Sequence, residues 1–174
     1  MERREYLKRF FKIIILCGKL ELLLRGHHES KTNNNQGNYC ERLNCLKEYD
    51  SFLMAYKPPG NAHYCSPPSQ NQMLSAAGNI ILKYIASEIR EAGYFAVMAD
   101  DTRDVSSYEQ FSIYVRYVDK TKTPKESFIS FEKVVDLDAE SLTKTLISSL
   151  NNNSLNAICV AQAYDGASVM KRHF

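Results

Sequence analysis

The sequence predicts an α/β protein: N-terminal helices, then a mixed β-sheet built from three antiparallel strands, a helix and a fourth, parallel strand. Three observations predict this class. Apolar residues recur at helical spacing through the first half. At Gly93 the period changes, and alternating or continuous apolar runs typical of strands follow. Short connections join the first three strands, whereas a helix precedes the last one.

Composition is that of an ordinary globular chain. Its 174 residues are 44% hydrophobic and 24% charged, and the formal net charge of +2 favours no particular partner. The five cysteines form no C-x-x-C pair, so we expect reduced thiols, as in the cytosol or nucleus, rather than a disulfide framework. The apolar run Ile13–Cys17 is too short for a signal or membrane segment, so we expect neither secretion nor membrane insertion.

The first half reads as three helices. The first carries an apolar stripe that continues to Gly26, made of Leu7, Phe10, Phe11, Ile14, Leu20, Leu23 and Leu24. A second helix is expected from Tyr39 to Phe52. The third can be capped by Ser66, with Pro67 at its first position, and Gly93 is a natural terminator.

The second half reads strand, strand, strand, helix, strand. The expected strands cover residues 94–99, 111–117, 126–137 and 157–163, and the first is expected to be buried on both faces. Asp138 can cap the helix from Ala139 to Leu150. We therefore predict a helical region over residues 1–92 and, over residues 93–174, the first part of a ribonuclease H-like sheet.

Two aspartates stand at predicted strand ends. Asp100 ends the first strand and Asp165 ends the fourth, and in a sheet that pairs these strands in parallel both would face one crevice. Carboxylate oxygens suit Mg²⁺ or Mn²⁺, and such ions activate water or a hydroxyl in phosphodiester chemistry. The alternative is that aspartates favour turns and caps after strands. That alternative is preferred for Asp101 and Asp104.

Other candidate sites are weaker. A zinc site could in principle use Cys40, Cys45, His63 and Cys65. Their spacing matches no common zinc-binding pattern, which favours packed or surface thiols instead. His27 and His28 follow a helix end and are expected to cap it. The basic residues considered for DNA contact are Lys8, Arg9, Lys12, Arg116 and Lys120, and a solvated charged face is the favoured alternative for them.

Five segments resemble one family. The segment "YFAVMADDTRDVSSYEQFSIYVRYVD" resembles a stretch of hAT-type transposase-derived proteins, and more narrowly a domain of zinc-finger MYM-type proteins and their transposon relatives. The segments "LLLRGHHES", "GNYCERLNCLKEYD", "GNAHYCSPPSQNQML" and "AQAYDGASVM" resemble other segments of that domain in the same order. The resemblance covers roughly residues 20 to 170.

The resemblance implies a ribonuclease H-like catalytic core of a DDE-type transposase, preceded by helices. It places the first two catalytic acids at Asp100 and Asp165, which would bind Mg²⁺ or Mn²⁺ in the complete site. It also implies DNA as a partner and a nuclear location, with the cytoplasm as the alternative. The third acid, a glutamate, is expected on a later helix beyond Phe174, so the sheet reads as truncated.

Three functional interpretations follow. The chain is a fragment of a DNA strand-transfer nuclease core, which we expect to be inactive by itself because the third acidic ligand is absent. Alternatively it is a domesticated, non-catalytic module that binds protein or DNA. The third possibility is a decayed transposon remnant. The sequence does not assign an oligomeric state.

Overall fold

The computed structural model describes most of the chain, and it does so in two compact units. The described residues are 2–26, 35–60, 62–103, 109–134 and 138–164. One unit covers residues 1–79 and the other residues 80–174, so the boundary falls inside a single helix. The domain boundary expected at residues 92 and 93 stays a prediction.

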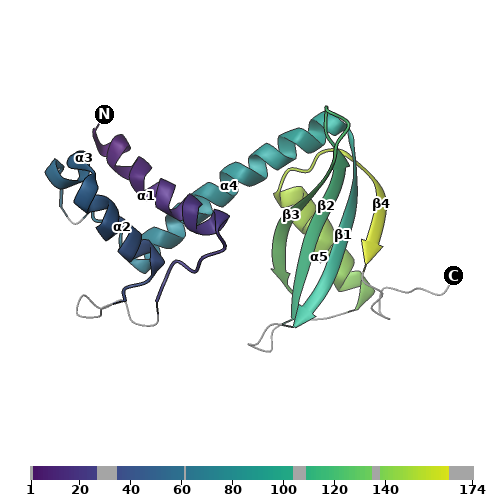
Figure 1. Cartoon of the computed structure of the whole chain (residues 1–174). Helices are drawn as coiled ribbons and strands as arrows, with labels where there is room; N and C mark the ends of the chain where they lie inside the picture. The colour runs from purple at the N-terminus through teal and green to yellow at the C-terminus, as the bar shows by residue number, and fades with distance from the viewer. Residues whose placement is uncertain (1, 27–34, 61, 104–108, 135–137, 165–174) are drawn as a thin grey trace. The chain divides into compact units, whose positions relative to one another are not determined.

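The first unit is helical (Figure 1). It contains α1 (Glu2–Lys19), α2 (Asn38–Tyr49), α3 (Ser51–Ala55) and the beginning of α4 (Pro67–Ala92). Its core forms where the apolar faces of these helices meet. The buried members are Tyr6, Phe10, Ile13, Ile14, Cys17, Tyr39, Leu43, Leu53 and Met73.

Helix α1 ends earlier than the sequence predicted. The apolar stripe suggested a helix reaching Gly26, but α1 stops at Lys19, and the side chain of Leu23 is 81% exposed. Glu21 adopts a left-handed conformation with φ of 55°. The amide of Leu22 donates to the carbonyl of Cys17 at 2.9 Å and that of Glu21 to Gly18 at 3.2 Å. This pair of bonds is a Schellman motif, which closes the helix despite the apolar spacing beyond it.

The second expected helix is divided in two, so that prediction was wrong in its bounds. Asp50 stands between α2 and α3 with φ of −93° and ψ of 101°, outside the helical region. Its carboxylate accepts a hydrogen bond from the amide of Leu53 at 3.0 Å and thereby caps α3. A local side-chain bond therefore interrupts an apolar pattern that continues through it.

Helix α4 begins and ends as predicted. The hydroxyl of Ser66 accepts a hydrogen bond from the amide of Ser69 at 3.4 Å, and Pro67 is the first helical residue. Gly93 follows the helix with φ of 78°, a backbone conformation that is unfavourable for residues with a side chain. Its amide donates a hydrogen bond to the carbonyl oxygen of Ile89 at 3.0 Å. The chain then enters the sheet directly.

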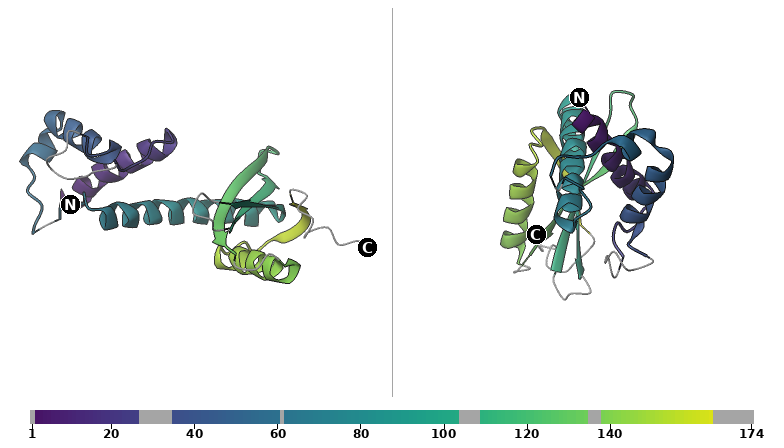
Figure 2. Two further views of the ribbon diagram at one scale, coloured as in Figure 1. Left: turned by 90° about the horizontal axis from the view of Figure 1, so that it is seen from below. Right: turned by 90° about the vertical axis from the view of Figure 1, so that its left-hand side faces the viewer.

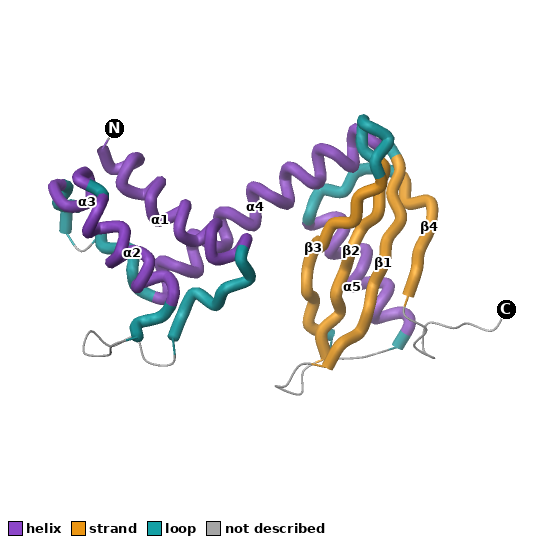
Figure 3. The backbone as a smooth tube through the Cα atoms, in the orientation of Figure 1, coloured by secondary structure: helices purple, strands orange, loops and turns teal. Residues whose placement is uncertain are grey.

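The second unit contains a four-stranded mixed sheet with strand order β3-β2-β1-β4 (Figure 3). Its elements are β1 (Tyr94–Arg103), β2 (Glu109–Val118), β3 (Pro124–Lys133), α5 (Ala139–Asn152) and β4 (Ile158–Tyr164). Strand β2 is antiparallel to β1 and β3, whereas β4 is parallel to β1. The predicted mixed sheet is thus confirmed. Asp138 caps α5 as predicted, accepting from the amides of Glu140 and Ser141 at 3.0 Å.

The core of the second unit lies on one side of the sheet, where α5 covers it (Figure 2). Ile89 from α4 and Leu142 and Leu146 from α5 belong to the same buried cluster as alternate residues of the strands. Strand β1 shows this alternation, because Phe95, Val97 and Ala99 are buried while Tyr94 is 58% exposed. The prediction that β1 is buried on both faces was therefore wrong.

Within the part of the chain that the structure describes, no helix has the length and apolar character needed to span a membrane.

Candidate functional site

The carboxyl end of the β1–β4 pair is where the sequence placed its metal site. The parallel pairing of these strands ends at Ala99 opposite Tyr164. In the sequence, Asp100 directly follows Ala99 and Asp165 directly follows Tyr164. Asp165 lies outside the described residues, so the pairing of the two carboxylates as metal ligands stays a prediction.

Strand β1 continues past Asp100, contrary to the prediction that this residue ends the strand. On its antiparallel side β1 pairs with β2 as far as Arg103, with Asp100 opposite Ser112 and Asp101 opposite Phe111. Asp101 is therefore a strand residue rather than a loop or cap residue. Asp104 lies outside the described residues. Asp100 stands where β1 leaves its parallel partner but keeps its antiparallel one.

The backbone at Asp100 is held in place by its neighbour. The hydroxyl of Ser112, which is only 4% exposed, donates to the carbonyl oxygen of Asp100 at 3.0 Å. Ala99 points into the core, so the alternation of a strand turns the half-buried side chain of Asp100 to the opposite face from α5. A carboxylate on a rigid strand is a suitable oxygen ligand for a hard cation.

Across the described ranges, no three His, Cys, Asp or Glu side chains gather closely enough to hold a metal ion. The residues considered for zinc, Cys40, Cys45, His63 and Cys65, therefore form no such group. Cys45 is exposed on α2, while the thiol of Cys65 donates to the carbonyl of His63 at 3.2 Å, and burial raises the pKa of that thiol. His27 and His28 lie outside the described residues.

Most of the basic residues considered for DNA contact are engaged within the protein. Arg9 Nε lies 2.7 Å from Asp50 Oδ2, and its guanidinium stacks over the ring of Phe52 at 4.4 Å. The hydrogen bond from Arg9 is the main reason that the pKa of Asp50 is lowered.

The other ion pairs among these basic residues are more exposed. Lys8 lies 3.7 Å from Glu5, Arg116 lies 3.2 Å from Glu126, and Lys120 lies 3.0 Å from Glu91. Such surface pairs leave the cations partly available, but the pairs scatter over both units. Lys12 differs from them because it borders a cavity.

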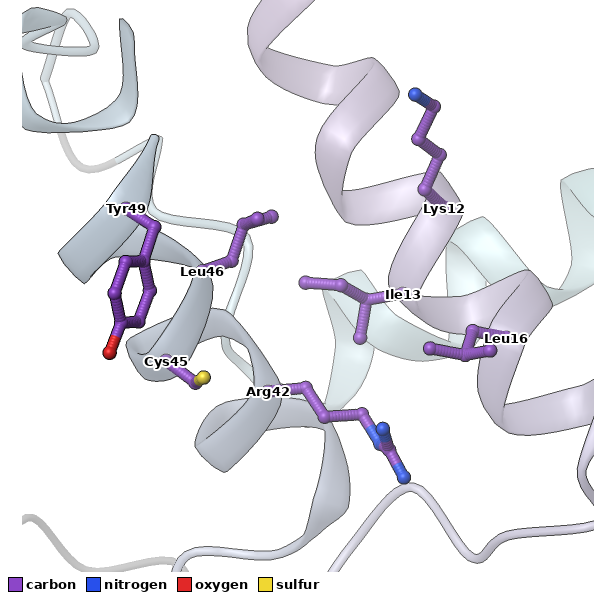
Figure 4. A pocket seen from close by; sticks show the side chains of 7 residues that line it. All are labelled: Lys12, Ile13, Leu16, Arg42, Cys45, Leu46 and Tyr49. Carbon is purple, nitrogen blue, oxygen red and sulfur yellow. The ribbon is translucent and has the colours of Figure 1, made fainter. Parts of the chain in front are cut away.

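That cavity is a groove between α1 and α2, which the sequence reasoning did not identify (Figure 4). Its volume is about 380 Å³. Ile13, Leu16, Leu46 and Tyr49 supply apolar lining, and the remaining lining residues are Lys12, Arg42 and Cys45. The signal in the sequence was the run Arg42, Leu46 and Tyr49 at helical spacing, which can equally mark an ordinary core face.

The chain is similar to known proteins over nearly its whole length. A family model described as the ZMYM1/FAM200 RNase-like domain (DUF4371) matches residues 1–174. The human protein named "52 kDa repressor of the inhibitor of the protein kinase" is 29% identical over 171 residues, and its mouse counterpart is 28% identical. Each alignment covers 94% of this chain but 22% of the relative, so the chain spans about a fifth of these relatives' length. No solved structure matches the chain.

Proposed function

The chain belongs to the ZMYM1/FAM200 RNase-like domain family, and we propose that it is part of a metal-dependent core derived from an hAT-type DNA strand-transfer nuclease. The observation that carries the proposal is the parallel pairing of β1 and β4, which ends one residue before Asp100 on β1 and at Tyr164, next to Asp165 in sequence. Ligands of α/β sheets bind beyond the carboxyl ends of parallel strands.

Asp100 and Asp165 are the residues proposed to hold Mg²⁺ or Mn²⁺. In a complete site such an ion activates a water or a 3′-hydroxyl and stabilises the leaving oxygen in phosphodiester chemistry. Asp100 contributes a carboxylate on a strand that Ser112 fixes by a hydrogen bond. The resemblance to hAT-type transposases implies a third acid, and with two acids the 174 residues tested alone should bind metal without transferring strands.

Metal binding by these two residues is tested by titrating Mn²⁺ into the chain and following free Mn²⁺ by electron paramagnetic resonance. We expect one saturable site that weakens at least about tenfold in both Asp100→Asn and Asp165→Asn, because each variant removes an anionic ligand. Glu140→Gln, at an exposed carboxylate on α5, is the matched control and should bind like the parent chain. Parent-like binding in Asp100→Asn would refute this assignment, as would the absence of saturable binding.

DNA is the proposed partner and the nucleus the proposed location. Both are what the resemblance to hAT-type transposases implies, and the relatives' printed name describes a repressor of an inhibitor of a protein kinase. A DNA-binding assay at two salt concentrations tests this, because phosphate contacts weaken as salt rises. Strand transfer by the isolated chain on a DNA substrate with Mn²⁺ would contradict the expectation that it is inactive alone.

The second candidate function is a domesticated module that keeps the scaffold for binding without catalysis. The groove between α1 and α2 favours it, because an apolar cavity bordered by two cations is unnecessary for metal chemistry at the β1–β4 end. Asp100→Asn tests each function by its own measurement. Loss of Mn²⁺ binding supports the nuclease-derived site, whereas unchanged Mn²⁺ binding together with unchanged partner binding leaves the binding module as the supported function.

A further inference from the structure

We propose that the groove between α1 and α2 binds an acidic, amphipathic helical segment of a partner protein. The proposal concerns residues far from Asp100 in the sequence, in the unit formed by residues 1–79. It does not depend on metal binding, so it can fail or succeed separately from the nuclease-derived site.

The groove presents apolar surface that the described chain does not cover. Leu16 is 41% exposed and Tyr49 is 80% exposed, although both line a cavity of about 380 Å³. That volume lies within the roughly 300–1,000 Å³ typical of ligand pockets. Figure 4 shows Ile13 and Leu16 from α1 facing the space toward Leu46 of α2. Apolar side chains from a partner would remove this surface from water.

The charge of the lining is positive. Lys12 and Arg42 are its charged members, and none of the described residues contributes a carboxylate to the lining. Arg42 Nε is buried, and within the described ranges it has no hydrogen-bond acceptor. A buried donor without an acceptor is unfavourable, and a carboxylate matches a guanidinium with two parallel hydrogen bonds. The groove therefore lacks a carboxylate beside its apolar surface.

An acidic amphipathic helix supplies both the apolar side chains and the carboxylates. An amphipathic helix can place apolar side chains at positions i, i+3 and i+4 into a groove between two helices while acidic side chains flank that stripe. Nucleic acid fits less well, because the groove lining is mainly apolar and Arg9, one turn away on α1, is held by Asp50 at 2.7 Å. Among the described residues, the lining itself offers two cations, Lys12 and Arg42, beside mainly apolar neighbours.

The probe is a synthetic, fluorescein-labelled helical peptide with leucines at i, i+3 and i+4 spacing and glutamates beside them. We expect saturable binding to the full 174-residue chain by fluorescence anisotropy. Arg42→Gln should raise the Kd by about tenfold or more, because it removes a charge-assisted hydrogen bond. Lys47→Gln, which removes the same charge from α2 outside the lining, is the matched control and should leave the Kd unchanged.

Further measurements distinguish a loss of binding from a loss of folding. Circular dichroism checks that Arg42→Gln keeps its helices, and Lys12→Gln, at an exposed position, should also weaken binding. A peptide with glutamines in place of its glutamates should bind more weakly to the parent chain. Parent-like affinity in both groove variants would overturn the proposal.

A footprint locates the peptide on the chain. Cys45 is exposed in the groove, whereas Cys159 is exposed on β4 in the other unit. Peptide should slow the alkylation of Cys45 by N-ethylmaleimide and leave that of Cys159 unchanged, as measured by mass spectrometry. Equal slowing at both cysteines, or at neither, would contradict the proposal. Displacement of the peptide by single-stranded DNA, or binding of decanoate without peptide binding, would assign the groove to a different ligand.

Discussion

At the scale of single residues, Tyr39 shows how the helical unit combines packing with one specific hydrogen bond. Its side chain is fully buried, and its hydroxyl donates to the carbonyl oxygen of Tyr64 at 3.0 Å. Burial raises the pKa of this phenol, so the hydroxyl remains protonated and keeps donating across the physiological pH range. Helix α2 is thereby tied to the segment that precedes α4.

Replacing Tyr39 by phenylalanine removes this donor but keeps the ring. We expect Tyr39→Phe to lower the free energy of unfolding by about 1–2 kcal/mol, because the Tyr64 carbonyl loses its donor. Urea unfolding followed by circular dichroism measures the change. Tyr49→Phe, on the same helix but 80% exposed, should change stability by less than about 0.5 kcal/mol. Similar losses in both variants would show that the hydrogen bond is not the cause.

At the scale of elements, Glu88 joins α4 to the β2–β3 hairpin. Its carboxylate accepts hydrogen bonds from Lys125 Nζ at 2.7 Å and from the Tyr117 hydroxyl at 2.7 Å. Lys125 also lies 3.2 Å from Asp119 at the turn between the strands. The hydrogen bond from Lys125 is the main reason that the pKa of Glu88 is lowered, whereas bonds from Thr121 and Thr123 chiefly lower that of Asp119.

These lowered pKa values predict acid sensitivity of the sheet unit. A carboxylate whose pKa is lower in the folded state stabilises that state above its unfolded pKa of about 4. The contribution is lost as the pH falls through the lowered folded value, because both states are then protonated. Thermal unfolding of the parent chain should therefore become easier as the pH falls below about 4.5.

Glu88→Gln tests how much of this acid sensitivity is due to the Glu88 carboxylate. The variant should be less stable at pH 7 by about 1 kcal/mol, a figure reduced for solvent screening, and its stability should fall less steeply in acid. Glu140→Gln removes an exposed carboxylate that pairs with Lys144 one helical turn away, and it should follow the parent profile. The idea fails if the Glu88 variant keeps the full acid dependence.

Local chemistry explains which elements the sequence predicted well. Gly93 and Asp138 mark their helix ends by backbone freedom and by a side-chain cap, and both signals are visible in a few consecutive residues. The end of α1 was missed because its left-handed residue is Glu21 rather than glycine. The extent of β1 was missed because antiparallel pairing with β2 carries it beyond its parallel partner.

At the scale of the whole molecule, topology was predictable because connection lengths restrict it. Short links required antiparallel neighbours, and the α5 crossover required a parallel strand, as β1 and β4 confirm. The groove and the Glu88 contacts were not predictable, since both join residues distant in sequence. The sequence also showed no sign of the boundary between the units inside α4. The apolar spacing continues through Ile80 and Ile81, which are 68% and 59% exposed in the structure. The pairing of Asp100 with Asp165 stays a prediction.

We expect the two units to unfold independently of each other. Among the described residues, their buried clusters share no member: one is made of positions between 6 and 73, the other of positions between 85 and 155. Phe10 and Ile89 are fully buried, one in each cluster. Phe10→Ala should cost about 3–5 kcal/mol and Ile89→Ala about 2–5 kcal/mol, by lost burial and the cavity left behind. Each loss should fall on the unit that contains the residue.

Amide hydrogen exchange read by mass spectrometry separates the two effects. Phe10→Ala should speed exchange in α1 and α2 while β1 and β2 keep the parent rates, and Ile89→Ala should do the reverse. Helix α4 reports on both, because its first turns contribute Met73 to one core and its last turns contribute Ile89 to the other. Faster exchange throughout the chain in either variant would mean that the units unfold as one, with α4 transmitting the loss between them.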